Sequence, residues 1–256
     1  MAKHDTPLIQ MIDLPAAMGL LTRLPVPVNA ETATARGAAG AWAWPLVGVV
    51  VGAISGLVAL ALMTLGLPLP LAAIIALSAQ VLMTGALHED GLADTVDGLW
   101  GGYSPARRLE IMKDSHIGAY GVIAISLSLF LRGMGLMAVL AAPFSIASLM
   151  VVGLLSRVPM VILMAAMPNA RGTGLSQSVG RPTRKTAILG TVVALALAVL
   201  IVGTAVLPMF IWISVTTIGL AALAKAKING QTGDILGSSQ QLAEIAALCV
   251  LASLAT

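Results

Sequence analysis

The sequence predicts an all-α integral membrane protein with six or seven transmembrane helices and an N-terminal helix at the membrane interface. Its 256 residues are 58% hydrophobic and only 10% charged, and the mean hydropathy is +0.98. A soluble domain carries about 25% charged residues. Apolar segments long enough to cross the ~30 Å hydrocarbon core follow one another along the chain. Abundant glycine and alanine favour close helix packing in lipid.

Seven apolar segments define the expected spans. Prolines such as Pro68, Pro143 and Pro208 separate neighbouring segments, so each segment is expected to form its own helix. The seventh segment begins with polar residues, which is why six spans is the alternative number. The segments are 38–67, 69–87, 118–142, 144–167, 187–207, 209–224 and 235–256.

An arm of residues 1–37 precedes this bundle of residues 38–256, and we expect 1–256 to form one domain. Within the arm, residues 8–24 mix apolar positions with Asp13 and Arg23, a pattern typical of a cytoplasmic or interfacial helix that does not span. The neighbouring Trp42 and Trp44 are expected in an aromatic belt at the interface.

Charge is confined to alternate connections between the spans. The connections near 66–70, 142–145 and 207–209 contain no charged residue, whereas the arm and the loops 88–117, 168–186 and 225–234 hold almost all of them. By the positive-inside rule, the charged face is the cytoplasmic face of the inner membrane. The net charge of +3 follows from these loops, so the expected partners include membrane lipid but no nucleic acid.

Residues 88–98 are the most informative segment, because four carboxylates and a histidine directly follow an apolar run. Ionisable groups at the edge of a bilayer are costly unless they are paired or bind something. On a helix, Asp90, Asp94 and Asp97 lie at i, i+4 and i+7, on one face. Like charges on one face repel, so we expect a bound cation, and oxygen ligands favour Mg²⁺ or Mn²⁺. His88 is a further candidate for the site: it could ligate the metal or form a hydrogen bond to a phosphate, or it could simply lie at the membrane interface.

Basic residues lie in the same charged loops. A metal ion combined with basic side chains is the usual arrangement in enzymes that transfer phosphoryl groups. The alternative is that these charges solvate a loop, pair with each other or orient the protein. The candidates for substrate binding are Arg107, Arg108, Lys113, Arg171, Lys225 and, inside the fourth span, Arg157. A second arginine inside a span, Arg132, needs an anionic partner or a watery cavity and is not expected to be catalytic.

A second acidic patch begins at Asp234, where a flexible turn leads into the last span. On a helix, Asp234, Ser238 and Gln241 share one face, and Glu244 follows near the same end. Asp234 is therefore a candidate metal ligand or base. The alternative is that Thr232 or Asp234 caps the helix, and the two roles are compatible.

Together these motifs resemble the cobalamin synthase (adenosylcobinamide-GDP ribazoletransferase) family of membrane enzymes. The resemblance covers nearly the whole chain and is carried above all by residues 85–98 and 109–121, with further matches at 21–27, 44–48, 232–237 and Glu244. Two residues depart from the family pattern. Glu89 replaces an apolar residue, and His116 replaces an arginine, which weakens any phosphate role for position 116.

The resemblance implies a reaction and a set of roles. The 3′-hydroxyl of α-ribazole, or of its 5′-phosphate, attacks the cobinamide-linked phosphorus of adenosylcobinamide-GDP, and GMP leaves. Mg²⁺ is the implied cofactor, held by Asp90, Asp94, Asp97 and Asp234. The base is one of Asp94, Asp97 and Glu89. Cations such as Arg107, Arg108, Lys113 or Lys225 would stabilise the leaving GMP. Self-association into a homo-oligomer is left open.

Two other classes of protein share parts of this pattern. CDP-alcohol phosphotransferases use similar chemistry, but the Ala-Arg after Asp-Gly and the later Gly-x3-Asp-x3-Asp of those enzymes are missing here. Transporters place acidic residues near the bilayer midplane and have repeated halves, whereas these acids lie at one edge. Release of GMP from adenosylcobinamide-GDP distinguishes the predicted enzyme from both.

Overall fold

The computed structural model describes residues 7–143 and 145–254. Outside these lie residues 1–6 of the predicted arm, Phe144 at the start of the fourth predicted span, and residues 255–256 at the end of the seventh. The described chain is all-α and contains no strand, which confirms the predicted fold class. In chain order the helices are α1 (Asp13–Leu21), α2 (Ala30–Arg36), the 3-10 helix η1 (Gly37–Ala43), α3 (Trp44–Thr64), α4 (Leu69–Thr84), α5 (Leu87–Gly101), α6 (Pro105–Ile111), α7 (Ala119–Ala141), α8 (Ser145–Ser156), α9 (Val158–Ala166), α10 (Leu175–Val179), α11 (Arg184–Val202), the 3-10 helix η2 (Gly203–Ala205), α12 (Val206–Ile228) and α13 (Gly233–Leu254).

The chain is a multi-pass membrane protein. Within the described residues, five helical stretches are long and apolar enough to cross a membrane, and α4 with α5 forms a sixth if this bent pair is one span. One of the five, Arg184–Ile228, is 45 residues long, whereas a single crossing needs about 20. This stretch contains α11 and α12, and Thr191 and Ser214 from the two helices line one cavity, so the helices fold back on each other. Counting them separately yields seven spans, the upper predicted number.

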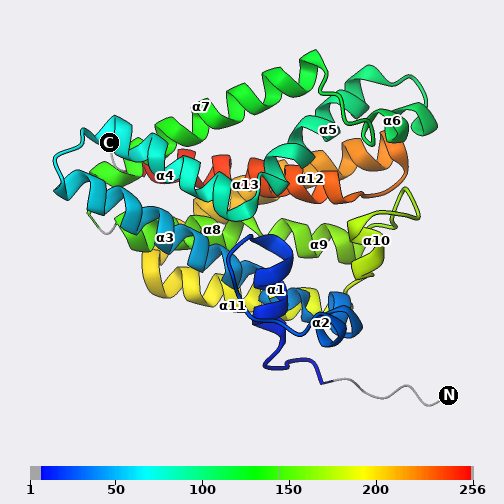
Figure 1. The fold of residues 1–256 in the computed structure, drawn as a ribbon, viewed down its shortest axis with the longest axis horizontal. Helices are drawn as coiled ribbons and strands as arrows, with labels where there is room; N and C mark the ends of the chain where they lie inside the picture. The colour runs from blue at the N-terminus through cyan, green and yellow to red at the C-terminus, as the bar shows by residue number, and fades with distance from the viewer. Residues whose placement is uncertain (1–6, 144, 255–256) are drawn as a thin grey trace.

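Helix α13 is the centre of the bundle and packs against α5, α7, α8, α9 and α12 (Figure 1). Large apolar side chains are exposed on the outer helices, among them Phe130 of α7, Leu200 of α11 and Trp212 of α12. Such a surface is unfavourable in water and favourable in lipid, which is consistent with a membrane-embedded bundle.

The predicted charged loops are largely helical. Most of 88–117 forms α5 and α6, 168–186 contains α10, and 225–234 covers the end of α12 and the start of α13. Figure 1 shows α6 and α10 at the end of the bundle opposite the C-terminus, so the charged segments do gather at one end.

Two predicted spans contain breaks that the sequence interpretation missed. The first lies in the stretch Ala30–Thr64, in which residues 37–43 form η1 and the long helix α3 begins at Trp44. The fourth is the stretch Ser145–Ala166, as predicted, but it is interrupted between α8 and α9 at Arg157, two residues before Pro159. Proline has no N–H to donate to the preceding turn and clashes with its carbonyl, which interrupts the helix.

The N-terminal arm is anchored by a buried ion pair. The side chain of Asp13 accepts from Arg36 Nε at 2.6 Å and from Trp42 Nε1 at 2.7 Å. Burial alone would raise the pKa of Asp13, but the hydrogen bonds from Arg36 and Trp42 outweigh burial and hold this pKa below 3.8. Trp44 is only 4% exposed, so its predicted place in an interfacial belt was wrong.

Candidate active site

A sharp bend between α4 and α5 sets the direction of the acidic segment. The two helices meet at 85°. Gly85 and Ala86 at the bend are both in the left-handed region, with φ of 62° and 56°. Glycine adopts this conformation without strain, and a side chain at position 85 would also crowd that of Arg23. The bend turns α5 against α7 and α13.

Two glycines bring α5 and α13 close together. Gly91 lies against the backbone of Asp234, and Gly237 lies against that of His88, so a Cβ at either glycine would be crowded. Ser238 Oγ donates a hydrogen bond to the carbonyl oxygen of Gly91 at 3.0 Å. This contact sets the two acidic segments, far apart in sequence, side by side.

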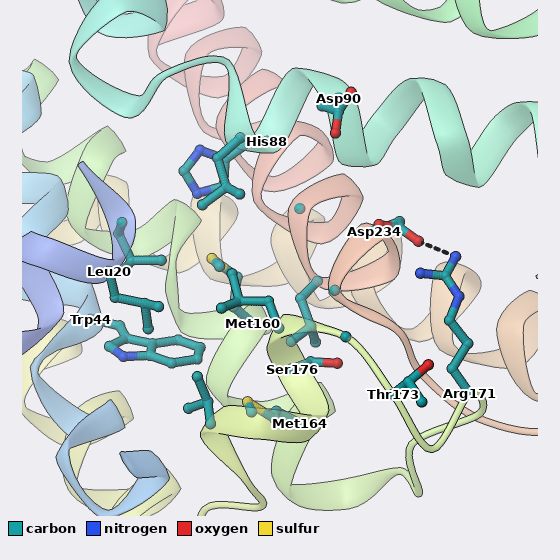
Figure 2. A pocket seen from close by; sticks show the side chains of 18 residues that line it. Leu20, Trp44, His88, Asp90, Met160, Met164, Arg171, Thr173, Ser176 and Asp234 are labelled. Atoms are coloured by element: carbon teal, nitrogen blue, oxygen red, sulfur yellow. Dashed lines mark hydrogen bonds and ion pairs between the residues drawn. The ribbon is translucent and has the colours of Figure 1, made fainter. Parts of the chain in front are cut away.

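Asp90, Asp94 and Asp234 form one electrostatically coupled cluster. Asp94 is repelled by the negative charges of Asp234 and Asp90 and attracted by Arg171. Asp234 pairs with Arg171 through Oδ2 and Nη2 at 2.6 Å (Figure 2). Within residues 7–143 and 145–254, the carboxylates of Asp90 and Asp94 have no hydrogen-bond or ion-pair partner.

Asp97 has a different environment from the other two carboxylates of α5. Its Oδ2 accepts from the backbone N–H of Gly118 at 2.7 Å, and Oδ1 accepts from that of Gly121 at 2.9 Å. Asp97 therefore caps the N-terminus of α7, a role that the sequence interpretation missed. Its predicted metal and base roles stay predictions.

The cluster fits Mg²⁺ as that ion is usually bound. Among the described residues, no three His, Cys, Asp or Glu side chains converge as a complete protein site. Mg²⁺, however, commonly takes one or two carboxylates and completes its shell with water and substrate phosphates. Asp90 and Asp94, one helical turn apart and without partners, can supply those two carboxylates. Asp234 is already paired with Arg171.

Arg171 is held at the cluster by two paired loops. The N–H of Ala170 donates to Gln231 O, and that of Gln231 donates to Pro168 O, each at 2.8 Å. Asn169 Oδ1 accepts from the N–H of Arg171 at 2.9 Å and fixes the turn. These contacts place the predicted substrate-binding arginine beside Asp234.

The other predicted cations lie in dissimilar places. Lys113 is exposed and donates to Thr173 Oγ1 at 3.3 Å, beside Arg171 in the same loop. Arg107 is exposed and pairs with Glu110, and Lys225 is exposed on α12.

The other two arginines bond to backbone carbonyls. Arg108 donates to those of Gly102 and Lys227, which ties α6 to α12. Arg157 is buried and donates to the carbonyl oxygen of Gly153 at 2.9 Å.

Glu89 belongs to a buried polar network. Its Oε1 accepts from Arg132 Nη1 at 2.6 Å, and Arg132 Nε donates to Glu244 at 3.0 Å. Gln80 and Gln241 complete the contacts of Arg132. The expected anionic partners of Arg132 are thus Glu89 and Glu244. The predicted role of Glu89 as a base stays untested, but Glu89 is committed to an ion pair.

A cavity of about 120 Å³ opens beside the carboxylates. Asp90, Asp234, Arg171 and Thr173 line its polar part, which we call the mouth. Its other walls are mostly apolar and come from α1, α3, α9 and α10, including Leu20, Trp44, Met160 and Met164 (Figure 2). Sequence reasoning missed these residues, because apolar side chains inside spans carry no sign of a binding site.

His88 lies within the cavity wall. It is 1% exposed, and its Nε2 has no hydrogen-bond partner within the described chain. A buried polar atom without a partner costs free energy, so this nitrogen is available to a ligand.

Comparison with known proteins decides the family. The family described as cobalamin-5-phosphate synthase (CobS) matches residues 13–252. The chain belongs to this family. Proteins of Brucella ovis and Brucella canis, both named adenosylcobinamide-GDP ribazoletransferase, are each 38% identical to it over 246 residues, covering 91% of this chain and 93% of theirs. No solved structure matches the chain.

The family match confirms the resemblance found in the sequence. It includes the bend, α5, the paired loops and the first turns of α13. The cobalamin-5-phosphate synthase family is therefore the context for the acidic cluster and the cavity.

Proposed function

We propose that this protein is an Mg²⁺-dependent adenosylcobinamide-GDP ribazoletransferase, active at the cytoplasmic face of the inner membrane. The observation that carries the proposal is the family match over residues 13–252, which includes the whole acidic cluster. The substrates are adenosylcobinamide-GDP and α-ribazole or its 5′-phosphate. A ribazole hydroxyl oxygen bonds to the cobinamide-linked phosphorus, the bond from that phosphorus to GMP breaks, and the hydroxyl proton passes to a base.

The structure suggests which residues act. Asp90 and Asp94 would hold Mg²⁺, which when bound neutralises negative charge on the pyrophosphate. Arg171 pairs with Asp234 and lies in the loop contacted by Lys113, so both cations would bind phosphate oxygens of the substrate. Of the three candidate bases, only Asp94 has no partner, whereas Asp97 and Glu89 accept hydrogen bonds. Asp94 is therefore the carboxylate to test first.

The test is GMP release by the purified protein in detergent. With adenosylcobinamide-GDP, α-ribazole and Mg²⁺, we expect GMP in amounts equal to the new phosphodiester. Omitting α-ribazole or chelating Mg²⁺ should stop the release. No GMP under complete conditions, or CMP release from a CDP-alcohol instead, would overturn the proposal. Inside-out vesicles supplied with external substrates test the side of the membrane.

Substitution separates chemistry from folding. Asp94→Asn should reduce GMP release at least about 100-fold and should not lower the melting temperature, because the carboxylate has no partner to lose and is repelled by Asp234 and Asp90. Glu31→Gln, an exposed acidic residue of α2, is the matched control and should keep wild-type turnover. Near-normal turnover of Asp94→Asn would exclude this residue from the metal site.

A further inference from the structure

The cavity beside the acidic cluster has two chemically different ends. Asp90, Asp234 and Arg171 line its mouth, whereas Leu20, Trp44 and Met164 surround the other end (Figure 2). Trp44 is 4% exposed, and Met164 is 1% exposed. The apolar and aromatic lining of this end suits a flat aromatic group.

The wall of the cavity contains a buried polar atom. Nε2 of His88 is buried without a hydrogen-bond partner in the described structure. Met160 and Met164 supply sulfur atoms that interact favourably with aromatic rings. The site thus combines an indole ring, two thioethers and a buried nitrogen that is free to form a hydrogen bond.

We propose that this cavity binds the aromatic base of α-ribazole, packed against Trp44 and hydrogen-bonded through its free ring nitrogen to His88 Nε2. The proposal rests on the proposed function and specifies the acceptor half of that site. A base at the apolar end directs its ribose hydroxyls toward Asp90 and Asp234 at the mouth. This orientation brings the attacking hydroxyl to the carboxylates, beside which the cobinamide-linked phosphorus would lie.

The chemistry of the walls disfavours the guanine of the other substrate. Guanine presents several donors and acceptors along its edge, and each loses free energy if it is buried without a partner. Among the described residues around the apolar end, His88 Nε2 is the fully buried side-chain atom that lacks a partner. A benzimidazole has one ring nitrogen that accepts a hydrogen bond, which matches His88 Nε2.

The first test is equilibrium binding of each substrate alone to the detergent-solubilised protein. Trp44→Leu should weaken α-ribazole binding about tenfold or more, the loss typical of a stacked base. Trp44→Phe should restore most of it, and adenosylcobinamide-GDP binding should not change. Trp212→Leu, on an exposed face of α12 outside the cavity, is the matched control and should bind both substrates normally.

The second test does not require Trp44 to be replaced. Wild-type protein should bind α-ribazole more tightly than an analogue with CH in place of the free ring nitrogen. His88→Leu should abolish this preference, and His88→Gln, which keeps a donor near the same position, should restore part of it.

The outcomes are distinct. If the wild type releases GMP but both sets of variants bind α-ribazole normally, the cavity proposal is wrong and the proposed function stands. Weakened adenosylcobinamide-GDP binding by Trp44→Leu would assign the cavity to that substrate and overturn the proposal. A wild type that neither binds α-ribazole nor releases GMP would refute the proposed function itself.

Discussion

Replacing Asp97 tests whether this carboxylate holds α7 in place. Both of its oxygens accept backbone N–H groups, from Gly118 and Gly121. Asparagine has one carbonyl oxygen, so Asp97→Asn leaves one of these N–H groups facing an amide nitrogen. A buried donor without its partner costs about 1–3 kcal/mol, and losing a negative charge at a helix N-terminus adds up to ~2 kcal/mol.

We therefore expect Asp97→Asn to lose at least about 2 kcal/mol of stability, the middle of the range for the unpaired N–H alone. For a protein of this size, that loss lowers the melting temperature by roughly 4 to 8 °C. The assay is thermal unfolding in detergent followed by tryptophan fluorescence, together with GMP release per folded molecule. Asp94→Asn, on the same helix without a partner, is the control and should melt no lower than wild type.

The pattern of the two variants decides between capping and chemistry. Capping predicts a lower melting temperature for Asp97→Asn and measurable turnover by its folded fraction. A variant that melts like wild type but has no turnover would refute the reasoning and return Asp97 to the metal site.

Three further predictions concern the frame around the site. Gly48→Ala should destabilise the protein by about 1–3 kcal/mol, because the new Cβ would overlap a backbone carbonyl of α8. Gly219→Ala, with open space around it, should be neutral or slightly stabilising. Equal melting temperatures of the two variants would contradict this packing. Arg132→Met should cost about 3–5 kcal/mol because it leaves two buried carboxylates unpaired, and replacing both carboxylates by glutamine should recover part of that loss in the same unfolding assay. Because the pKa of Asp13 is lowered in the folded state, its ion pair stabilises the fold above pH 3.8, and this stability is lost as the pH falls through the folded-state pKa. The difference in melting temperature between wild type and Asp13→Asn should thus be constant from pH 7 to 5 and shrink below 3.8. A difference independent of pH throughout would argue against this role of Asp13.

Hydropathy and charge placement were sufficient to predict the architecture. A segment in lipid must satisfy its own backbone hydrogen bonds, so length and apolarity nearly determine that it is a helix. The spans at 118–142 and 209–224 accordingly correspond to α7 and α12. The break at Arg157 inside the fourth span was missed, because a proline in an apolar run does not show by itself whether the helix is interrupted.

The candidate site was predictable in its composition but not in its division of roles. Residues at i and i+4 share a helical face wherever the helix lies, so the grouping of Asp90 and Asp94 follows from spacing alone. Whether a neighbouring carboxylate faces a metal or a helix end depends on which element packs against it. Asp97 faces the N-terminus of α7, and Glu89 faces Arg132, contacts between residues 21 to 43 positions apart.

By itself, the sequence determined that this protein is a helical membrane protein of the cobalamin-5-phosphate synthase family with an acidic segment at one end of its bundle. Those properties depend on local composition, spacing and motif. Only the tertiary structure decided that α5 bends back against α13, that Arg171 meets Asp234, and that Trp44 and His88 enclose a cavity beside them. The physical reason is that these contacts join segments far apart in the chain, and apolar side chains look alike in sequence whether they face lipid, core or ligand.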